Sequence, residues 1–320
     1  MNIEELLEQA ADQAKEEGRQ LNIVMMEMNT VGNSFRRLQE AYDGVEAATL
    51  LGRINSFYES GASSEVLLQQ ALDSLKGLEG QIEVSDELQS KRMNLEQGIR
   101  NMLIAGYAVQ AGAKYHRAKI YELVAESDPS EHEANQSSIE SMQQAAASYQ
   151  KAFSTFNDSD PDTPSSELYD SRVILMPQIL TYWSQAHIYL AHEAAKRGNQ
   201  LYRGAFAQDP GLHDEGTVVR MHDLLFLAFE TEGQPDEDKA LEALQAYDAS
   251  IEHLHAVGRI YFAAKSAGVE LDGEIFLQNP TRNLRIILSA AAVISKKIGN
   301  ENLSEKYIQG RMDLSEKYVQ

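Results

Sequence analysis

The sequence predicts an all-α protein, and three observations support that fold class. Apolar residues recur at the spacing of one helix face along most of the chain, whereas the alternation typical of β-strands is almost absent. Only 7 prolines occur in 320 residues, which leaves room for long helices. Apolar residues form 43% of the chain, enough for the core of one large domain or two ordinary ones.

The composition argues against several kinds of partner and chemistry. The formal net charge is −21, from 49 acidic and 28 basic residues. Nucleic acids and anionic membrane surfaces are bound through clustered Lys and Arg, so neither is an expected partner. The chain has no Cys, which excludes disulfides, thiolate zinc sites and thiol nucleophiles. A salt-adapted host would favour such an acidic surface, but ordinary acidic proteins share it.

The N-terminal sequence MNIEELLEQAADQAKEEG is acidic and amphipathic. It lacks the basic start and apolar run of a signal peptide. Nor does any stretch approach the ~18 apolar residues that a membrane span needs. We therefore expect a cytoplasmic protein that has no membrane partner.

Residues 1–84 are predicted to form an N-terminal helical region that contains a degenerate helix pair. Breaks are expected at Gly32, with Ser34 as the cap of the next helix, and at Gly61, where Gly-Ala-Ser-Ser is typical of a turn. A cluster of methionines before the first break is interpreted as gap-filling core rather than an adaptable binding surface. The expected helices are 2–31, 35–59 and 64–78, and the methionines are Met25, Met26 and Met28.

The second predicted region, residues 85–320, begins with a long helix from Ser85 to about Glu126. Its middle carries small residues that leave a hollow where a neighbouring helix can approach closely. A helix after Pro129 repeats a small-aromatic-small pattern. The small and aromatic positions are Ala108, Ala111, Gly112 and Tyr115 on the first helix and Ala145, Tyr149 and Ala152 on the second.

The most regular stretch runs from Tyr182 to Pro210 and alternates large and small residues at helical spacing. Gly198 is expected to form a turn between two helices, and Pro210 to end the second helix. Pro177 is expected to kink or split the preceding helix near Met176. The patterned positions are Tyr182, Ala186 and Tyr189, then Tyr202 and Ala205.

This order of large, small and aromatic positions resembles a tetratricopeptide repeat, a helix pair of roughly 34 residues. Two positions depart from the family's pattern, because Gly198 replaces the usual Ala and Gln185 an aliphatic residue. The resemblance covers about residues 98–317 and implies stacked antiparallel helix hairpins that form a superhelix. Anchor positions near that period are Tyr182, Leu224, Leu254 and Ile287, and the last begins a helix pair with the turn KKIGNEN.

A short repeat closes the chain, since LSEKYIQ recurs as LSEKYVQ eleven residues later. A period of eleven places the repeated apolar residues on one helical stripe. We interpret this stripe as a C-terminal capping helix, and alternatively as a seam for a partner or a second copy of the chain. The stripe residues are Leu303, Tyr307, Leu314 and Tyr318.

The sequence contains no recognisable catalytic or metal-binding motif, so no catalytic residue, cofactor or metal is predicted. An acidic loop with Asp158, Asp160 and Asp162 lacks the Gly and the Glu of a calcium loop. His213, beside Asp214, lacks a metal-ligand spacing. Two other histidine pairs are too poorly spaced within their helices to converge, and the single Trp183 is expected in a groove wall or core. The pairs are His187 with His192 and His253 with His255.

The resemblance implies a non-catalytic scaffold or adaptor that holds a protein or peptide in a helical-repeat groove. First helices line that groove in the family, so residues outside their packing stripe are the predicted partner-binding residues. Gln185 and Asn101 are predicted amide donors to a peptide backbone. Arg259 and Lys114 are predicted anion partners, and Tyr121 an apolar wall. The negative net charge favours a basic partner whose binding weakens with salt.

Two other classes of function remain open. One is a structural subunit of a larger assembly, viral or homo-oligomeric, that uses the C-terminal helix or the methionines as contacts. The other is an all-α enzyme, which would need an enclosed polar cavity with perturbed carboxylates. No sequence motif supports the enzyme, so we expect none.

Overall fold

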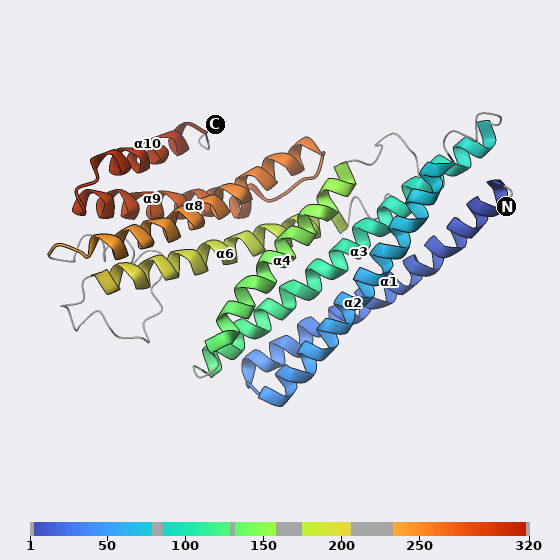
Figure 1. Ribbon diagram of the computed structural model, residues 1–320, viewed down its shortest axis with the longest axis horizontal. Coiled ribbons are helices and arrows are strands. Elements are labelled where there is room, and N and C mark those ends of the chain that lie inside the picture. The colour runs from blue at the N-terminus through green and yellow to red at the C-terminus, as the bar shows by residue number, and fades with distance from the viewer. Residues whose placement is uncertain (1–2, 79–85, 129–131, 158–174, 206–232, 318–320) are drawn as a thin grey trace. The chain divides into compact units, whose positions relative to one another are not determined.

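The computed structural model describes residues 3–78, 86–128, 132–157, 175–205 and 233–317, and all regular elements within these ranges are helical (Figure 1). The all-α prediction is therefore confirmed. The chain divides into two compact units, Met1–Ala186 and His187–Gln320, and the boundary falls inside one helix, α6 (Met176–Ala205). Pro177 is the second residue of α6, and Leu175 just before this helix is π-helical.

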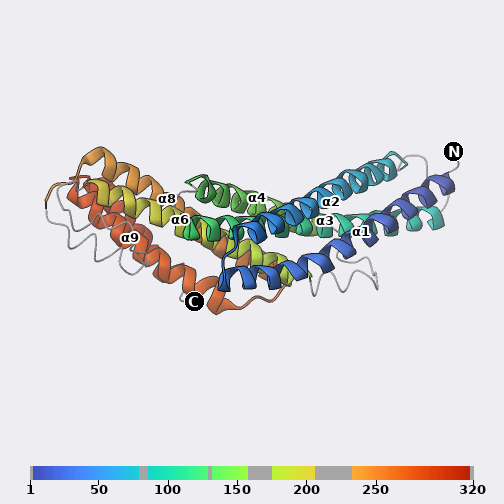
Figure 2. The same cartoon turned by 90° about the horizontal axis from the view of Figure 1, so that it is seen from below.

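The described residues of the first unit form four long helices and the start of α6 (Figures 1 and 2). Cross-helix hydrogen bonds join neighbouring helices, and the first two helices are antiparallel because Gln13 pairs with Leu67 whereas Thr30 pairs with Arg53. The Gln13 amide donates to the Leu67 carbonyl between the first two helices, and the Ser138 hydroxyl donates to the Ala118 carbonyl between the last two. The helices are α1 (Ile3–Glu40), α2 (Gly44–Gly77), α3 (Asp86–Ser127) and α4 (His132–Asn157).

The predicted break at Gly32 is wrong, because α1 continues through it to Glu40. Val31 and Leu38, seven residues apart, are fully buried on either side of this segment, so the apolar stripe keeps its helical period. The next helix is capped by Asp43 instead of Ser34. One Asp43 carboxylate oxygen accepts hydrogen bonds from the backbone N–H groups of Val45 and Glu46 at 2.7 and 3.2 Å.

The predicted turn at Gly61 is also wrong, since α2 passes through it without interruption. A Cβ atom at Gly61 would lie 3.0 Å from the side chains of Val109 and Gln110 and 3.2 Å from the Gly106 carbonyl oxygen. The glycine therefore permits close approach of α3 and makes no turn.

The predicted hollow on α3 is confirmed, and a methionine fills it. A Cβ atom at Gly112 would lie 2.5 Å from the Met28 methyl group of α1. Met25 and Met28 both pack against the buried cluster of this unit, as the core interpretation requires, whereas Met26 is exposed.

The described residues of the second unit form the rest of α6, then α8, a short π-helix and a closing helix pair (Figure 1). α6 and α8 are antiparallel: the Asp236 N–H donates to the Ala205 carbonyl, and the Ser250 hydroxyl donates to the Ala191 carbonyl at 2.7 Å. The closing pair turns at Gly299, whose φ of 75° suits glycine. The elements are α8 (Glu237–Ser266), η3 (Glu274–Gln278), α9 (Asn279–Lys297) and α10 (Glu301–Lys317).

The predicted turn at Gly198 is wrong, and the large-small pattern around it lies along the single helix α6. A Cβ atom at Gly198 would lie 2.7 Å from the ring of Tyr247 on α8, so the glycine accommodates that ring. The Tyr247 hydroxyl donates to the Asn199 side-chain oxygen at 2.6 Å, and both residues are buried. Pro210 and the helix expected over 217–232 lie outside the described residues.

The helix pair predicted from Ile287 onwards is confirmed as the antiparallel hairpin of α9 and α10, with its turn in KKIGNEN. On α10, Tyr307 and Leu314 are each only 2% exposed and belong to the core cluster that contains Ile287. These two stripe residues therefore cover the core of their own unit, whereas Tyr318 lies outside the described residues.

No described helix combines the length and the apolarity required to cross a membrane.

Candidate functional site

Three of the predicted partner-binding residues lie on α3. Asn101 donates its side-chain N–H to the Gln97 carbonyl of the preceding turn at 2.8 Å. Lys114 and Tyr121, seven residues apart, share a helix face, whereas Asn101 lies on another. The Arg117 guanidinium lies 5.4 Å from the centre of the Tyr121 ring.

Lys114 faces the neighbouring helix α2. Its ammonium lies 3.9 Å from the centre of the Tyr58 ring, and the residue is 9% exposed. Burial and the positive charge of Arg117 lower the pKa of Lys114. Little of this cation is therefore available to an anionic partner in the described structure.

The other two predicted residues are exposed and already paired. Gln185 accepts a hydrogen bond from the Tyr115 hydroxyl at 3.1 Å. Arg259, in the second unit, forms an ion pair with Glu252 at 2.6 Å. Each of the five residues thus contacts a residue outside the predicted set, and their role in binding a partner stays a prediction.

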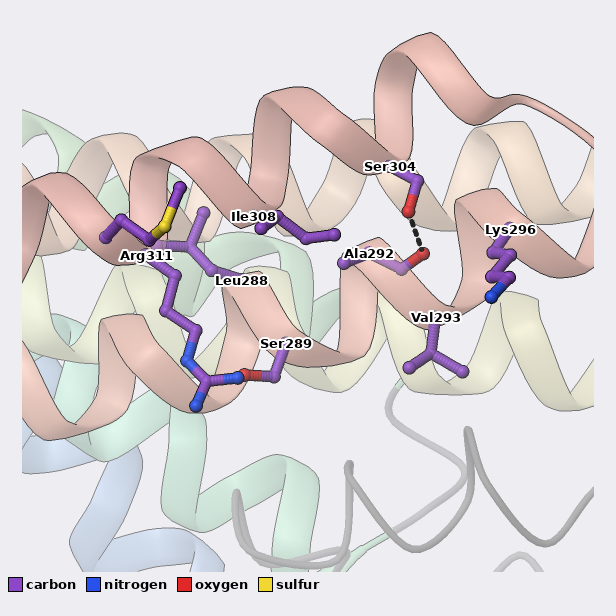
Figure 3. Close-up of a pocket in the computed structure, with 9 residues that line it drawn as sticks. Leu288, Ser289, Ala292, Val293, Lys296, Ser304, Ile308 and Arg311 are labelled. Atoms are coloured by element: carbon purple, nitrogen blue, oxygen red, sulfur yellow. Dashed lines mark hydrogen bonds between the residues drawn. The ribbon is translucent and has the colours of Figure 1, made fainter.

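A groove of about 460 Å³ lies between α9 and α10, and we call it the α9–α10 groove (Figure 3). Its floor is apolar, and two of its side chains stand out to solvent: Ile308 is 48% and Met312 53% exposed. Five lining residues come from α9 and four from α10. They are Leu288, Ser289, Ala292, Val293 and Lys296, then Ser304, Ile308, Arg311 and Met312.

The sequence of the hairpin explains why this groove forms. Tyr307 turns inward to the core, so Ile308 and Met312, one turn apart, form a second apolar stripe beside it. Ala292 and Ser304 have short side chains at the crossing of the helices. The Ser304 hydroxyl donates to the Ala292 carbonyl at 3.0 Å, which brings the two helices close at that end of the hairpin.

The charge of the groove is opposite to that of the whole chain. Lys296 and Arg311 lie at opposite ends of it (Figure 3). The nine lining residues include no carboxylate, although the chain carries a net charge of −21. The groove therefore offers an apolar floor between two cations.

The inward stripe of α10 does not by itself predict this groove. The i, i+4 pair of Ile308 and Met312 is a readable signal, since both are large apolar residues outside that stripe. Arg311 between them marks the same face as solvent-accessible, because a charged residue is rarely buried without a partner.

A histidine pair links α6 to α8 in the second unit. The Nδ1 atoms of His187 and His253 are 3.0 Å apart, so one ring donates a hydrogen bond and the other accepts it. Burial is the main cause that lowers the pKa of His187 to about 4, and the charges of His253 and Arg259 contribute less. Burial also lowers the pKa of His253. The pair is therefore neutral at pH 7. Residue spacing within single helices cannot predict this pair, because its two histidines lie 66 residues apart on different helices.

The other residues considered from the sequence are Trp183 and the two possible metal-binding clusters. Trp183 is partly buried and packs against Phe153, with ring centres 5.8 Å apart. The acidic loop at Asp158 and the cluster at His213 lie outside the described residues. Among the residues that are described, no three His, Cys, Asp or Glu side chains are grouped so as to hold a metal ion.

Comparison with known proteins gives no family. No protein-family model matches the chain, and no curated protein matches it. One solved structure, described as "Computational Design of Self-Assembling Cyclic Protein Homooligomers", is similar over 96% of this chain and 99% of its own at 10% identity. Its TM-score is 0.19, too low to support an argument about fold or assembly.

Proposed function

We propose that this protein is a non-catalytic scaffold that binds a segment of another protein, and that the α9–α10 groove is its binding surface. The observation that carries the proposal is the exposure of Ile308 and Met312 above an apolar floor. Single exposed apolar residues are ordinary, whereas a hollow lined by several of them is typical of an interaction site.

The position of the groove on α9 also supports this proposal. α9 is the first helix of the hairpin that resembles a tetratricopeptide repeat, and first helices line the binding groove in that family. Ser289, Val293 and Lys296 line the groove and lie outside the buried positions of α9, such as Ile287 and Ile294. The stacked superhelix that the resemblance implies stays a prediction.

The test is capture of a partner from host lysate on the immobilised full chain, with a groove variant beside it. Met312→Glu places a charge beside the apolar floor at a half-exposed position, so the fold is expected to survive. Val45→Glu is the matched control, because Val45 is 77% exposed on α2. We expect wild type and Val45→Glu to retain the same partner and Met312→Glu to lose it.

Two results would contradict the proposal. Equal retention by Met312→Glu would exclude the groove as the binding surface. A stable oligomer in light scattering, with no retained partner, would favour the structural subunit instead.

A further inference from the structure

We infer that the α9–α10 groove takes an acidic amphipathic helix of its partner, an inference that rests on the function proposed above. Two antiparallel helices leave a furrow into which side chains of a third helix fit as ridges into grooves. The lining of α9 extends from Leu288 to Lys296, and the eight steps between these residues span about 12 Å along the helix axis. That length matches two to three turns of an occupant.

The apolar part of the groove defines the contact face of the occupant. Ile308 and Met312 are one turn apart and flank a floor built from Leu288, Ala292 and Val293. An occupant helix with large apolar residues at i and i+4 would bury its side chains there. Met312 is unbranched and adapts its shape to such side chains.

The charged residues at the two ends of the groove determine which charge the occupant should carry. Lys296 and Arg311 each offer a cation, and the lining holds no carboxylate to pair with them. Carboxylates at both ends of the occupant's apolar face would meet these cations, whereas lysines there would be repelled. The net charge of the chain favours basic partners at long range, but this groove selects locally for an acidic one.

The experiment measures binding of three synthetic helical peptides to the full chain by fluorescence anisotropy. Each peptide has about four helical turns and two leucines at i and i+4, flanked by Glu, Gln or Lys. At low salt we expect the Glu peptide to bind about tenfold more tightly than the Lys peptide, with the Gln peptide between them. The difference should narrow as salt is added.

A pair of charge-reversal variants assigns the preference to the groove. Lys296→Glu combined with Arg311→Glu should reverse the order of the three peptides. Lys15→Glu combined with Arg36→Glu changes the net charge equally at exposed positions of α1 and should keep the order. Equal affinities for the three peptides, or equal effects of both double variants, would overturn the inference.

The outcomes separate this inference from the proposed function. If Met312→Glu abolishes capture of the lysate partner and the Glu peptide has no advantage, the acidic helix is wrong and the scaffold stands. If Met312→Glu leaves capture unchanged, the function itself fails. Preferential binding to phosphatidylserine vesicles, lost in the groove reversal variant, would also overturn the helical occupant.

Discussion

Gly61 in the first unit and Gly198 in the second occupy the same kind of position with different neighbours. Both lie inside long helices, on α2 and α6, where glycine costs about 1 kcal/mol relative to alanine. Both offset this cost by admitting a neighbouring helix. A Cβ atom at Gly61 would lie 3.2 Å from the backbone oxygen of Gly106, whereas a Cβ atom at Gly198 would lie 2.7 Å from the ring of Tyr247.

This difference separates two ways in which helices approach one another. At Gly61 two backbones are close, and the Gln110 amide, 5% exposed, donates to the Gly61 carbonyl at 3.3 Å and to Glu65 at 2.7 Å. At Gly198 a large side chain fills the space above the glycine and is held by its bond to Asn199. A substitution can remove the side chain that crowds Gly198, but no substitution removes the backbone oxygen that crowds Gly61.

The largest expected effect is at Gly198. Gly198→Leu would force a side chain into the space of the buried Tyr247 ring, and overpacking of this kind costs about 3 kcal/mol. In the double variant with Tyr247→Ala the leucine gains room, so the combined loss should be about 2 kcal/mol smaller than the sum of the single losses. Urea unfolding measures all three variants. A Gly198→Leu protein as stable as wild type would refute the close contact.

The next effect concerns pH and also belongs to the second unit. The pKa of His187 is about 4 in the folded state, below the ordinary value of 6.5. Between these values the unfolded chain binds a proton that the folded chain does not, so stability falls as the pH drops from 6.5 to 4. The nearby charges act in opposite directions, since Arg259 lowers this pKa and Glu252 raises it.

We expect this histidine to account for a loss of about 2 kcal/mol on acidification, after allowance for partial solvent access. His187→Gln removes the titrating group, so the variant should show a flatter stability profile than wild type over this range. Urea unfolding at several pH values gives both profiles. Parallel profiles would mean that His187 titrates normally in the folded protein.

These two glycines also show which features of the fold can be predicted from the sequence. Helical spacing predicted the fold class and the boundaries of α3. Apolar residues that recur at this spacing, such as Ile99, Leu103 and Ala118, are the ones buried in the structure. It also predicted the α9–α10 hairpin, whose Gly299 has positive φ. It failed at Gly32, Gly61 and Gly198, where the same residue type lies within helices.

The candidate site was harder to predict for a related reason. A glycine that forms a turn and a glycine that faces a neighbouring helix differ only in what lies opposite, and opposite residues are distant in sequence. The groove and the pair of His187 with His253 likewise depend on which helices meet. Spacing within one helix predicts a face but does not identify the element that covers it.

The smallest effect is expected at Gly61, and it tests whether this glycine permits close approach of two helix backbones. Alanine at Gly61 gains helix propensity, but its Cβ would have contacts of 3.0 to 3.2 Å and push α3 away. We expect a net destabilisation of about 1 kcal/mol in urea unfolding. Gly52→Ala is the matched control on α2, because no atom lies within 4 Å of its Cβ position, and it should stabilise by about 0.5 to 1 kcal/mol.

A double variant shows whether backbone or side-chain contacts crowd position 61. Gln110→Ala removes one of the crowded atoms but leaves Val109 and the Gly106 carbonyl in place. The destabilisation by Gly61→Ala should therefore persist in the Gln110→Ala background, in contrast to the relief expected at Gly198 when Tyr247 is reduced. If Gln110→Ala abolishes it, the contact at Gly61 is one of side chains, and the two glycines work in the same way.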